Sequence, residues 1–275
     1  MCILIFMKIH SLHRVKPHTK VRLSQYPADD TGIYKASNEA DAQLEDNRQR
    51  LDALQELFAA SAQHALLIIL QGMDTGGKDG TIRHIFTGVN PQGCQITQFK
   101  VPTPLELRHD FLWRAHAAVP AKGMIGIFNR SHYEDVLVVR VHKKISDKQA
   151  HRRMDEIVAW EEMLAANGVV ILKFFLHISY EEQTRRLGER LADPNKHWKI
   201  SESDFAERKF WPDYQQAYED VLARTSRKHA PWFIVPSNHK WYRNAAISEI
   251  LLQTLTGLKM KFPQPTFDLK KLVLD

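Results

Sequence analysis

Runs of consecutive apolar residues alternate along this chain with longer segments in which apolar residues recur every three or four positions. The runs predict five strands, at residues 66–71, 95–100, 124–129, 169–177 and 232–236. The segments between them predict helices, at residues 78–89, 104–118, 133–140, 149–167, 179–191, 203–226 and 240–257. A strand such as 169–177 is apolar on both faces. The pattern therefore favours an α/β fold in which a buried parallel sheet lies between helices on each side.

The first part of the chain lacks this alternation. Residues 8–37 are rich in Lys, Arg, His, Pro and Asp and show no sustained period, whereas residues 38–62 carry apolar residues at helical spacing. We therefore expect an extended N-terminal arm over residues 1–37 and a single domain over residues 38–275, with a lid around residues 185–210.

The segment 72–80 (GMDTGGKDG) directly follows the first predicted strand and has the pattern of a phosphate-binding loop. Its glycines let consecutive N–H groups point at one phosphate, and the following helix adds the positive end of its dipole. The predicted phosphate-binding residues are Gly72, Thr75, Gly76, Gly77, Lys78, Asp79 and Gly80. Asp79 stands where a nucleotide hydrolase has Ser or Thr, and a second carboxylate, Asp74, lies inside the loop. A carboxylate repels phosphate unless a divalent cation bridges them or it handles a proton, so we interpret Asp74 as a metal-organising or basic residue.

A polar cluster, NRSHYED, follows the third predicted strand at residues 129–135. If the carboxyl ends of the strands converge, this cluster faces the phosphate loop. Arg130 would then stabilise a phosphoryl group during transfer, and Glu134 or Asp135 would hold magnesium or a substrate. Ser131 and Glu134 also have the spacing of a helix-capping box, and both interpretations can hold together.

A third group of charged residues predicts a basic lid. Its cations are Arg185, Arg186, Arg190, Lys196, Lys199 and Arg208. Arg186 and Arg190 share a helical face, and Pro194 ends that helix, so the next segment carries the two lysines. A lid of this kind neutralises phosphate charge and excludes water, whereas the plainer interpretation is a solvated basic helix. Spacing does not settle whether Arg185 or Arg186 points inward. Further along, Pro212 predicts a kink in the helix 203–226.

Composition adds a charge argument. The net charge of +6 suits a polyanionic partner, which could be nucleic acid, nucleotide or an inorganic phosphate chain. The basic part of the arm (Arg14, Lys16, Lys20 and Arg22) either reaches such a polyanion or is a solvated face. Two cysteines without metal-site spacing fit a reducing cytoplasm. The apolar residues 1–7 are too few for a signal core or a membrane span, and we assign them no function.

Taken together, four segments resemble the polyphosphate kinase 2 family of P-loop kinases. They read GMDTGGKDG, IFNRSHYEDV, DPNKHWK and APWFIVPSNHKWYRN, in that order, and the resemblance runs from about Arg14 to Leu258. It implies a three-layer P-loop kinase sandwich with a central parallel sheet and a helical lid. It also implies transfer of a phosphoryl group between inorganic polyphosphate and AMP or ADP, with GMP and GDP as further acceptors, supported by Mg²⁺ or Mn²⁺. The pair Glu134-Asp135 resembles the group that acts on both mono- and diphosphates.

The resemblance also implies roles for individual residues. Asp74, Lys78, Arg130 and Asp135 would be catalytic, with Asp74 and Asp135 organising metal. Asn129, Glu134 and Asp135 would lie near the acceptor nucleotide, while the six lid cations would cover the site or line a polyphosphate channel. We further expect a cytoplasmic homo-oligomer, a dimer or tetramer, with no nucleic-acid or membrane partner.

Two other functions remain open at this point. An ATP-dependent nucleotide or small-molecule kinase would have the same loop and lid, so the identity of the phosphate donor separates it from a polyphosphate-dependent enzyme. A basic nucleic-acid-binding protein with a decayed phosphate loop would also suit the net charge, although the sequence contains no recognised nucleic-acid motif.

Overall fold

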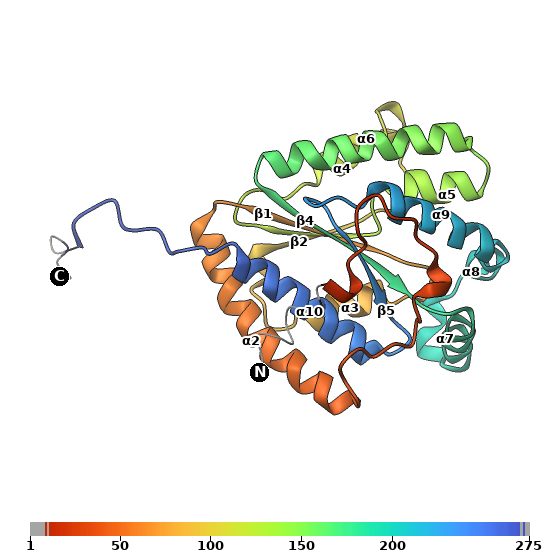
Figure 1. The fold of residues 1–275 in the computed structure, drawn as a ribbon, viewed down its shortest axis with the longest axis horizontal. Helices are drawn as coiled ribbons and strands as arrows, with labels where there is room; N and C mark the ends of the chain where they lie inside the picture. Colours follow the sequence, from red (N-terminus) through yellow and green to blue (C-terminus); the bar gives the residue numbers. More distant parts are fainter. Residues whose placement is uncertain (1–8, 10, 270–271, 273–275) are drawn as a thin grey trace.

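A sheet of five parallel strands forms the centre of the computed structural model, which describes residues 9, 11–269 and 272 (Figure 1). In spatial order the strands are β2 (Cys94–Gln98), β3 (Ile125–Asn129), β1 (Ala65–Gln71), β4 (Val169–His177) and β5 (Trp232–Pro236). All four neighbouring pairs are parallel. The five predicted strands are confirmed, with small differences at their ends.

Helices cover both faces of this sheet. Their bounds are α2 (Ser37–Ser61), α3 (Lys78–Ile85), α4 (Trp113–Ala117), α5 (Glu134–Val141), α6 (Asp147–Ala166), α7 (Tyr180–Ala192), α8 (Glu202–Glu207), α9 (Trp211–Thr225) and α10 (Lys240–Gly257). Short 3₁₀ turns lie at η1 (Leu23–Gln25), η2 (Pro91–Gly93), η3 (Glu106–Arg108), η4 (Pro194–Lys199) and η5 (Arg208–Phe210). Helices α2, α3 and α10 lie on one face, and α5, α6 and α9 lie on the other (Figure 1).

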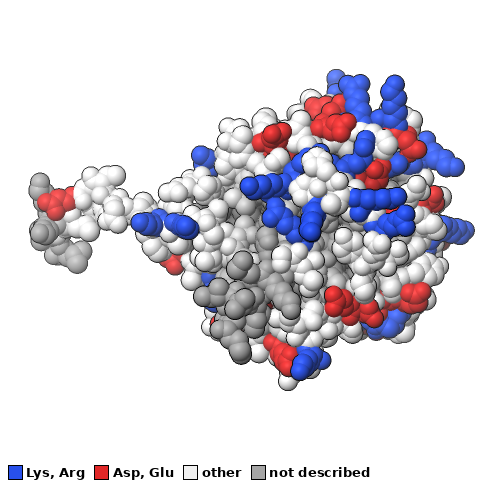
Figure 2. Space-filling model, viewed as in Figure 1, with Lys and Arg blue, Asp and Glu red and all other residues white. Residues whose placement is uncertain are grey.

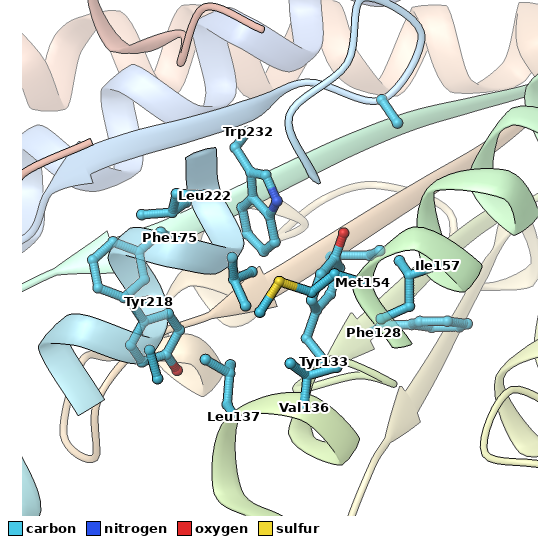
Figure 3. Close-up of a cluster of buried hydrophobic side chains, with 14 of the residues drawn as sticks. Phe128, Tyr133, Val136, Leu137, Met154, Ile157, Phe175, Tyr218, Leu222 and Trp232 are labelled. Atoms are coloured by element: carbon cyan, nitrogen blue, oxygen red, sulfur yellow. The ribbon is translucent and has the colours of Figure 1, made fainter. Parts of the chain in front are cut away.

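Two hydrophobic clusters join these three layers. Along β1, Leu67 and Ile69 belong to one cluster while Leu66 and Ile68 belong to the other, because successive strand residues point to opposite faces. Figure 3 shows part of the first cluster, to which β3, α5, α6, β4, α9 and β5 all contribute. The predicted three-layer α/β architecture is therefore confirmed.

The register of the strands aligns their carboxyl ends. Leu70 of β1 lies opposite Asn129 of β3, and Gln71 lies opposite Phe175 of β4. The residues that follow β1, β3 and β4 consequently meet at one edge of the sheet, where ligands bind in open α/β folds.

Two of the predicted helices are wrong in detail. In place of a helix at 104–118 the chain forms only η3 and α4, since Pro102 and Pro104 lie at its start and Asp110 Oδ1 accepts a hydrogen bond from Leu112 N at 3.0 Å in a turn. The helix 203–226 is interrupted by η5 rather than kinked. Pro212 lies in the first turn of α9, where its missing N–H has no intrahelical partner to lose.

The described part of the arm packs along the β5 edge of the sheet. Arg14 forms an antiparallel bridge with Phe233, and Val15 N donates to Trp232 O at 2.8 Å. Val15, Val21 and Leu23 are buried. Covering an edge strand in this way protects its unpaired backbone groups. Residues 1–7 lie outside the described residues. Among the described helices, none combines the length and apolarity needed to cross a bilayer.

Candidate functional site

The phosphate loop curls between the end of β1 and the start of α3, as its glycines predict. Gly76 N donates to Met73 O at 2.9 Å, and the ammonium group of Lys78 donates to Gly72 O at 2.8 Å and to Met73 O at 3.4 Å. Burial, with a smaller contribution from Arg130, lowers the pKa of Lys78 to about 8. Lys78 is therefore folded back onto the loop, with its charge poorly solvated and available to an anion.

Arg243, a residue that sequence reasoning missed, supports the loop from α10. It is buried, and its guanidinium group donates to Gly76 O at 3.3 Å and to Asn244 Oδ1 at 2.8 Å. A Cβ atom on Gly77 would lie 2.0 Å from Arg243 Nη1, and Gly77 has a φ of 97°. The sequence gives no specific signal for this contact beyond an arginine in the first turn of a helix.

Replacing Gly77 with alanine is expected to destabilise the protein by on the order of 2 kcal/mol and to weaken phosphate binding, because it combines a left-handed φ with a clash. Urea denaturation and phosphate affinity measure the two effects. Gly188→Ala is the matched control, since a Cβ atom there meets nothing within 4 Å and lies inside α7. Equal stability of the two variants would contradict the proposed support by Arg243.

Arg130 joins the strand-end cluster to the loop. Its guanidinium group pairs with Asp74 Oδ1 at 2.7 Å and with Glu134 Oε2 at 3.2 Å, and its backbone N donates to Leu70 O at 3.1 Å. Its φ of 61° turns the chain back over the edge of the sheet. The expectation that this cluster faces the phosphate loop is confirmed. Beside it, Asn129 Nδ2 donates to Asp79 Oδ1 at 2.6 Å.

Asp135 has a buried partner that the sequence did not predict. Its Oδ2 atom lies 2.8 Å from Arg114 Nη2, and both side chains are largely buried. Arg114 also donates to Lys100 O at 2.8 Å. The carboxylate of Asp135 is thus paired with a largely buried cation, and metal ligation by Asp135 stays a prediction.

The predicted capping box at Ser131 is also wrong. Tyr133 occupies the N-cap position of α5, and none of the described side chains forms a capping hydrogen bond there. Ser131 Oγ instead accepts from Tyr133 N at 3.2 Å and from Gln71 Nε2 at 3.0 Å. Ser131 therefore ties the end of β3 to the end of β1.

Tyr133 anchors the start of α5 to the protein interior. Its hydroxyl donates to Glu161 Oε1 at 2.9 Å and accepts from Lys173 Nζ at 3.0 Å. Glu161 and Lys173 are fully buried and pair at 2.5 Å. In Figure 3 the Tyr133 ring lies among side chains of β3, α5 and α6. The residues that follow it, Glu134 and Asp135, are held in place by this buried network.

The structure distinguishes the two adjacent lid arginines. Arg186 is buried and donates to Thr75 O at 2.8 Å and to Asn238 O at 3.1 Å. Arg185 is exposed and pairs with Glu182 and Glu189 on its own helix. Arg186 is thus the inward-pointing arginine of the pair and braces the phosphate loop against the turn between β5 and α10, while its role towards polyphosphate stays a prediction.

A cleft opens between the loop, α5, α7, α8 and α9. Its lining residues are Gly72, Met73, Asp74, Arg130, Glu134, Leu137, Val138, Gln183, Asp204, Glu207, Arg208, Tyr214 and Tyr218. Among the predicted lid cations, Arg208 lines this cleft, donating to Thr184 Oγ1 at 2.6 Å and lying 4.2 Å from the Tyr180 ring centre.

The remaining lid cations are held within the lid segment itself. Arg190 donates to Lys199 O at 3.4 Å, and Lys196 pairs with Asp193 at 2.8 Å. Lys199 lies 4.8 Å from the ring centre of the exposed Trp198. These three side chains do not line the cleft in this structure.

The described residues contain no group of three or more His, Cys, Asp or Glu side chains arranged as a metal cage. Magnesium is commonly held by one or two carboxylates together with substrate phosphates and water, which needs no such cage. Asp74 fits this manner of binding, because it is half-buried, lines the cleft and belongs to the phosphate loop.

A phosphate loop at the carboxyl end of the central strand of a parallel sheet, with a helical lid beside it, is the arrangement of the P-loop kinases. The model of the polyphosphate kinase 2 family matches residues 34–263, and the chain belongs to this family. It is 48% identical over 264 residues to the AMP/ADP-polyphosphate phosphotransferase of Meiothermus ruber, covering 96% of this chain and 99% of that protein.

Two further comparisons agree. The ADP-polyphosphate phosphotransferase of Rhodopseudomonas palustris is 43% identical over 265 residues, covering 92% of each chain. The crystal structure of polyphosphate kinase 2 from Arthrobacter aurescens TC1 superposes with a TM-score of 0.92 at 42% identity, covering 95% of this chain and 94% of that one. The fold is thus that of the family over nearly the whole chain.

Proposed function

We propose that this protein transfers a phosphoryl group between inorganic polyphosphate and the terminal phosphate of AMP or ADP. The observation that carries the proposal is the position of Arg130, which lies between Asp74 of the phosphate loop and Glu134 at the start of α5. A phosphoryl group held by the loop and an acceptor phosphate beside α5 would both contact this guanidinium group. The named activities of the Meiothermus ruber and Rhodopseudomonas palustris relatives support the same reaction.

Positioning and charge neutralisation account for the roles of the individual residues. The loop N–H groups and Lys78 would bind the phosphates, while Arg130 would stabilise the charge that develops on the transferred group. Bound Mg²⁺, or Mn²⁺ in its place, would supply further neutralisation of the phosphate oxygens, and Asp74 is the residue that would hold it. An acceptor phosphate is itself an anion at neutral pH, so the chain needs no strong general base.

A coupled assay tests this function. AMP, ADP, GMP and GDP are each offered with polyphosphate and magnesium, and the same acceptors are offered with ATP as the donor. We expect turnover of AMP and ADP with polyphosphate, and we extend this expectation to GMP and GDP. If ADP forms from AMP with ATP as the donor and never with polyphosphate, the protein is instead an ATP-dependent kinase.

The acceptor preference provides a separate prediction. Glu134→Gln and Asp135→Asn are expected to reduce kcat/KM about tenfold more for AMP than for ADP, because a monophosphate offers one phosphate fewer for binding and depends more on contacts at α5. Steady-state kinetics with both acceptors measures the ratio. Equal losses for the two nucleotides would argue that this pair supports a step common to both.

Assembly and location remain predictions. We propose a cytoplasmic homo-oligomer, a dimer or a tetramer, without a nucleic-acid partner. Sedimentation of the purified protein measures the mass of the assembly, and binding to a nucleic-acid duplex at matched salt measures the competing interaction.

A further inference from the structure

A band of cations lies on the face that the N-terminal arm crosses, outside the cleft. We call it the arm patch. Its members are Arg14, Lys16, Lys20, Arg22, Arg224, Arg227 and Lys228. Figure 2 shows Lys and Arg side chains gathered on this face. Five of the seven side chains are exposed, and Arg14 and Arg227 are half-buried.

The fold brings the two parts of the arm patch together from opposite ends of the sequence. Arg14 Nη2 donates to Lys228 O at 3.0 Å, and Ser226 Oγ donates to Val15 O at 2.8 Å. Along the arm, Val15 and Val21 are buried while their neighbours Lys16, Lys20 and Arg22 are exposed. The same contacts that cover the edge of the sheet therefore hold a row of positive charges towards solvent.

Few direct ion pairs offset this row. Within the described residues, Lys16, Lys20, Arg22 and Lys228 form no ion pair with a carboxylate, and Arg224 lies 3.8 Å from Asp220. Asp220 is itself shared with Arg140 at 2.7 Å. Like charges gathered in this way repel one another, which favours binding of a polyanion.

Beyond the arm patch, the arm itself continues towards the carboxyl edge of the sheet. Beyond Arg22, Leu23 N donates to Glu219 Oε1 at 2.7 Å, and the neighbouring Tyr218 lines the cleft. His177, the last residue of β4, lies near the backbone of Tyr26 and Leu23. The arm thus continues from its last cation, Arg22, to the end of the sheet at which the phosphate loop lies.

We propose that the arm patch binds the distal part of a long polyphosphate chain whose end occupies the cleft. This proposal rests on the proposed function. Polyphosphate carries about one charge per unit, so neutralising it releases counterions as neutralising a nucleic acid does. Single-stranded nucleic acids are usually held by aromatic stacking as well, and residues 14–22 and 224–229 contain no Phe, Trp or Tyr. The residues of the arm patch therefore favour a polyanion that carries no nucleobases.

Binding at the arm patch has a specific kinetic consequence. A long chain contacts both the patch and the cleft, and the second contact is then made at high effective concentration. A short polyphosphate of a few units occupies the cleft alone. Loss of the patch should raise KM for long chains and leave KM for short chains and kcat unchanged.

The experiment compares the triple variant Lys16→Gln, Lys20→Gln, Arg22→Gln with the triple variant Lys143→Gln, Lys144→Gln, Lys148→Gln. All six lysine and arginine side chains are exposed, so both variants lose three surface charges. We expect the first variant to raise KM for long-chain polyphosphate about tenfold. The slope of log affinity for long chains against log salt concentration should also become shallower in this variant. Each lost phosphate contact removes about 0.7 from the slope, so three lost contacts remove about 2. The second variant should behave as the wild type.

Fluorescence anisotropy with labelled long-chain polyphosphate, measured without nucleotide, tests the patch independently of turnover. The same measurement with single-stranded nucleic acid tests the competing partner. Unchanged long-chain affinity in the arm variant, an equal loss in the control, or a loss confined to nucleic acid would each overturn the proposal. Arg224→Gln with Lys228→Gln repeats the test from the other segment. If the wild-type protein binds polyphosphate but does not transfer phosphate, the proposed function fails while the proposal for the arm patch stands.

Discussion

Replacement of Lys78 by alanine is expected to abolish measurable phosphoryl transfer, a loss on the order of a thousandfold, while the fold persists. Among the described residues, the hydrogen-bond partners of the ammonium group are carbonyl oxygens of the loop, at Gly72 and Met73, and Lys78 belongs to neither apolar cluster. Its removal therefore deletes a phosphate-binding cation without opening a cavity in the core. Circular dichroism and urea denaturation check that the fold is retained.

Lys148→Ala provides the matched control, since this lysine is exposed on α6, outside the residues that line the cleft. The wild-type pH profile gives a second test. Because burial lowers the pKa of Lys78 to about 8, kcat/KM for polyphosphate should fall as the pH rises through that value in the free enzyme. Bound phosphates raise the pKa, so kcat should decline only at higher pH. Full activity of Lys78→Ala would exclude the phosphate loop as the donor site.

Replacement of Asp74 by asparagine is expected to lower kcat by on the order of a hundredfold or more and to raise the magnesium concentration needed for half-maximal activity. In the wild-type protein Asp74 Oδ1 accepts from Arg130 at 2.7 Å. Asparagine has the same size and keeps an oxygen that can accept this hydrogen bond, so the main loss is the negative charge. Titration of activity with Mg²⁺ measures the effect.

Asp46→Asn is the control for Asp74→Asn, because Asp46 pairs with Arg50 on the exposed face of α2. Retention of full activity and of the wild-type magnesium dependence in Asp74→Asn would remove the metal-organising role. A loss of activity with unchanged magnesium dependence would leave Asp74 as the residue that orients Arg130.

Local sequence patterns determined the layers of the fold and the place of the phosphate loop. Burial on both faces of β4 requires a continuous apolar run, and a tight loop that turns its N–H groups to a phosphate requires glycines. Both requirements concern residues that are neighbours in the sequence, so a local pattern is enough to predict these two features. Arg130 was also predictable, because the carboxyl ends of parallel strands meet at one edge. The helix expected at 104–118 failed since the turn at Asp110 and the prolines before it override the apolar spacing.

Only the tertiary structure decided which charged side chains face the cleft and which support it. Arg185 and Arg186 are adjacent in the sequence, yet one is exposed and the other bonds to Thr75 O, because burial depends on the turn between β5 and α10 packed against them. Arg243 and Arg114 likewise gain their roles from partners 167 and 21 residues away. Contacts over such separations depend on how the layers pack, so the pattern of a single segment does not contain them.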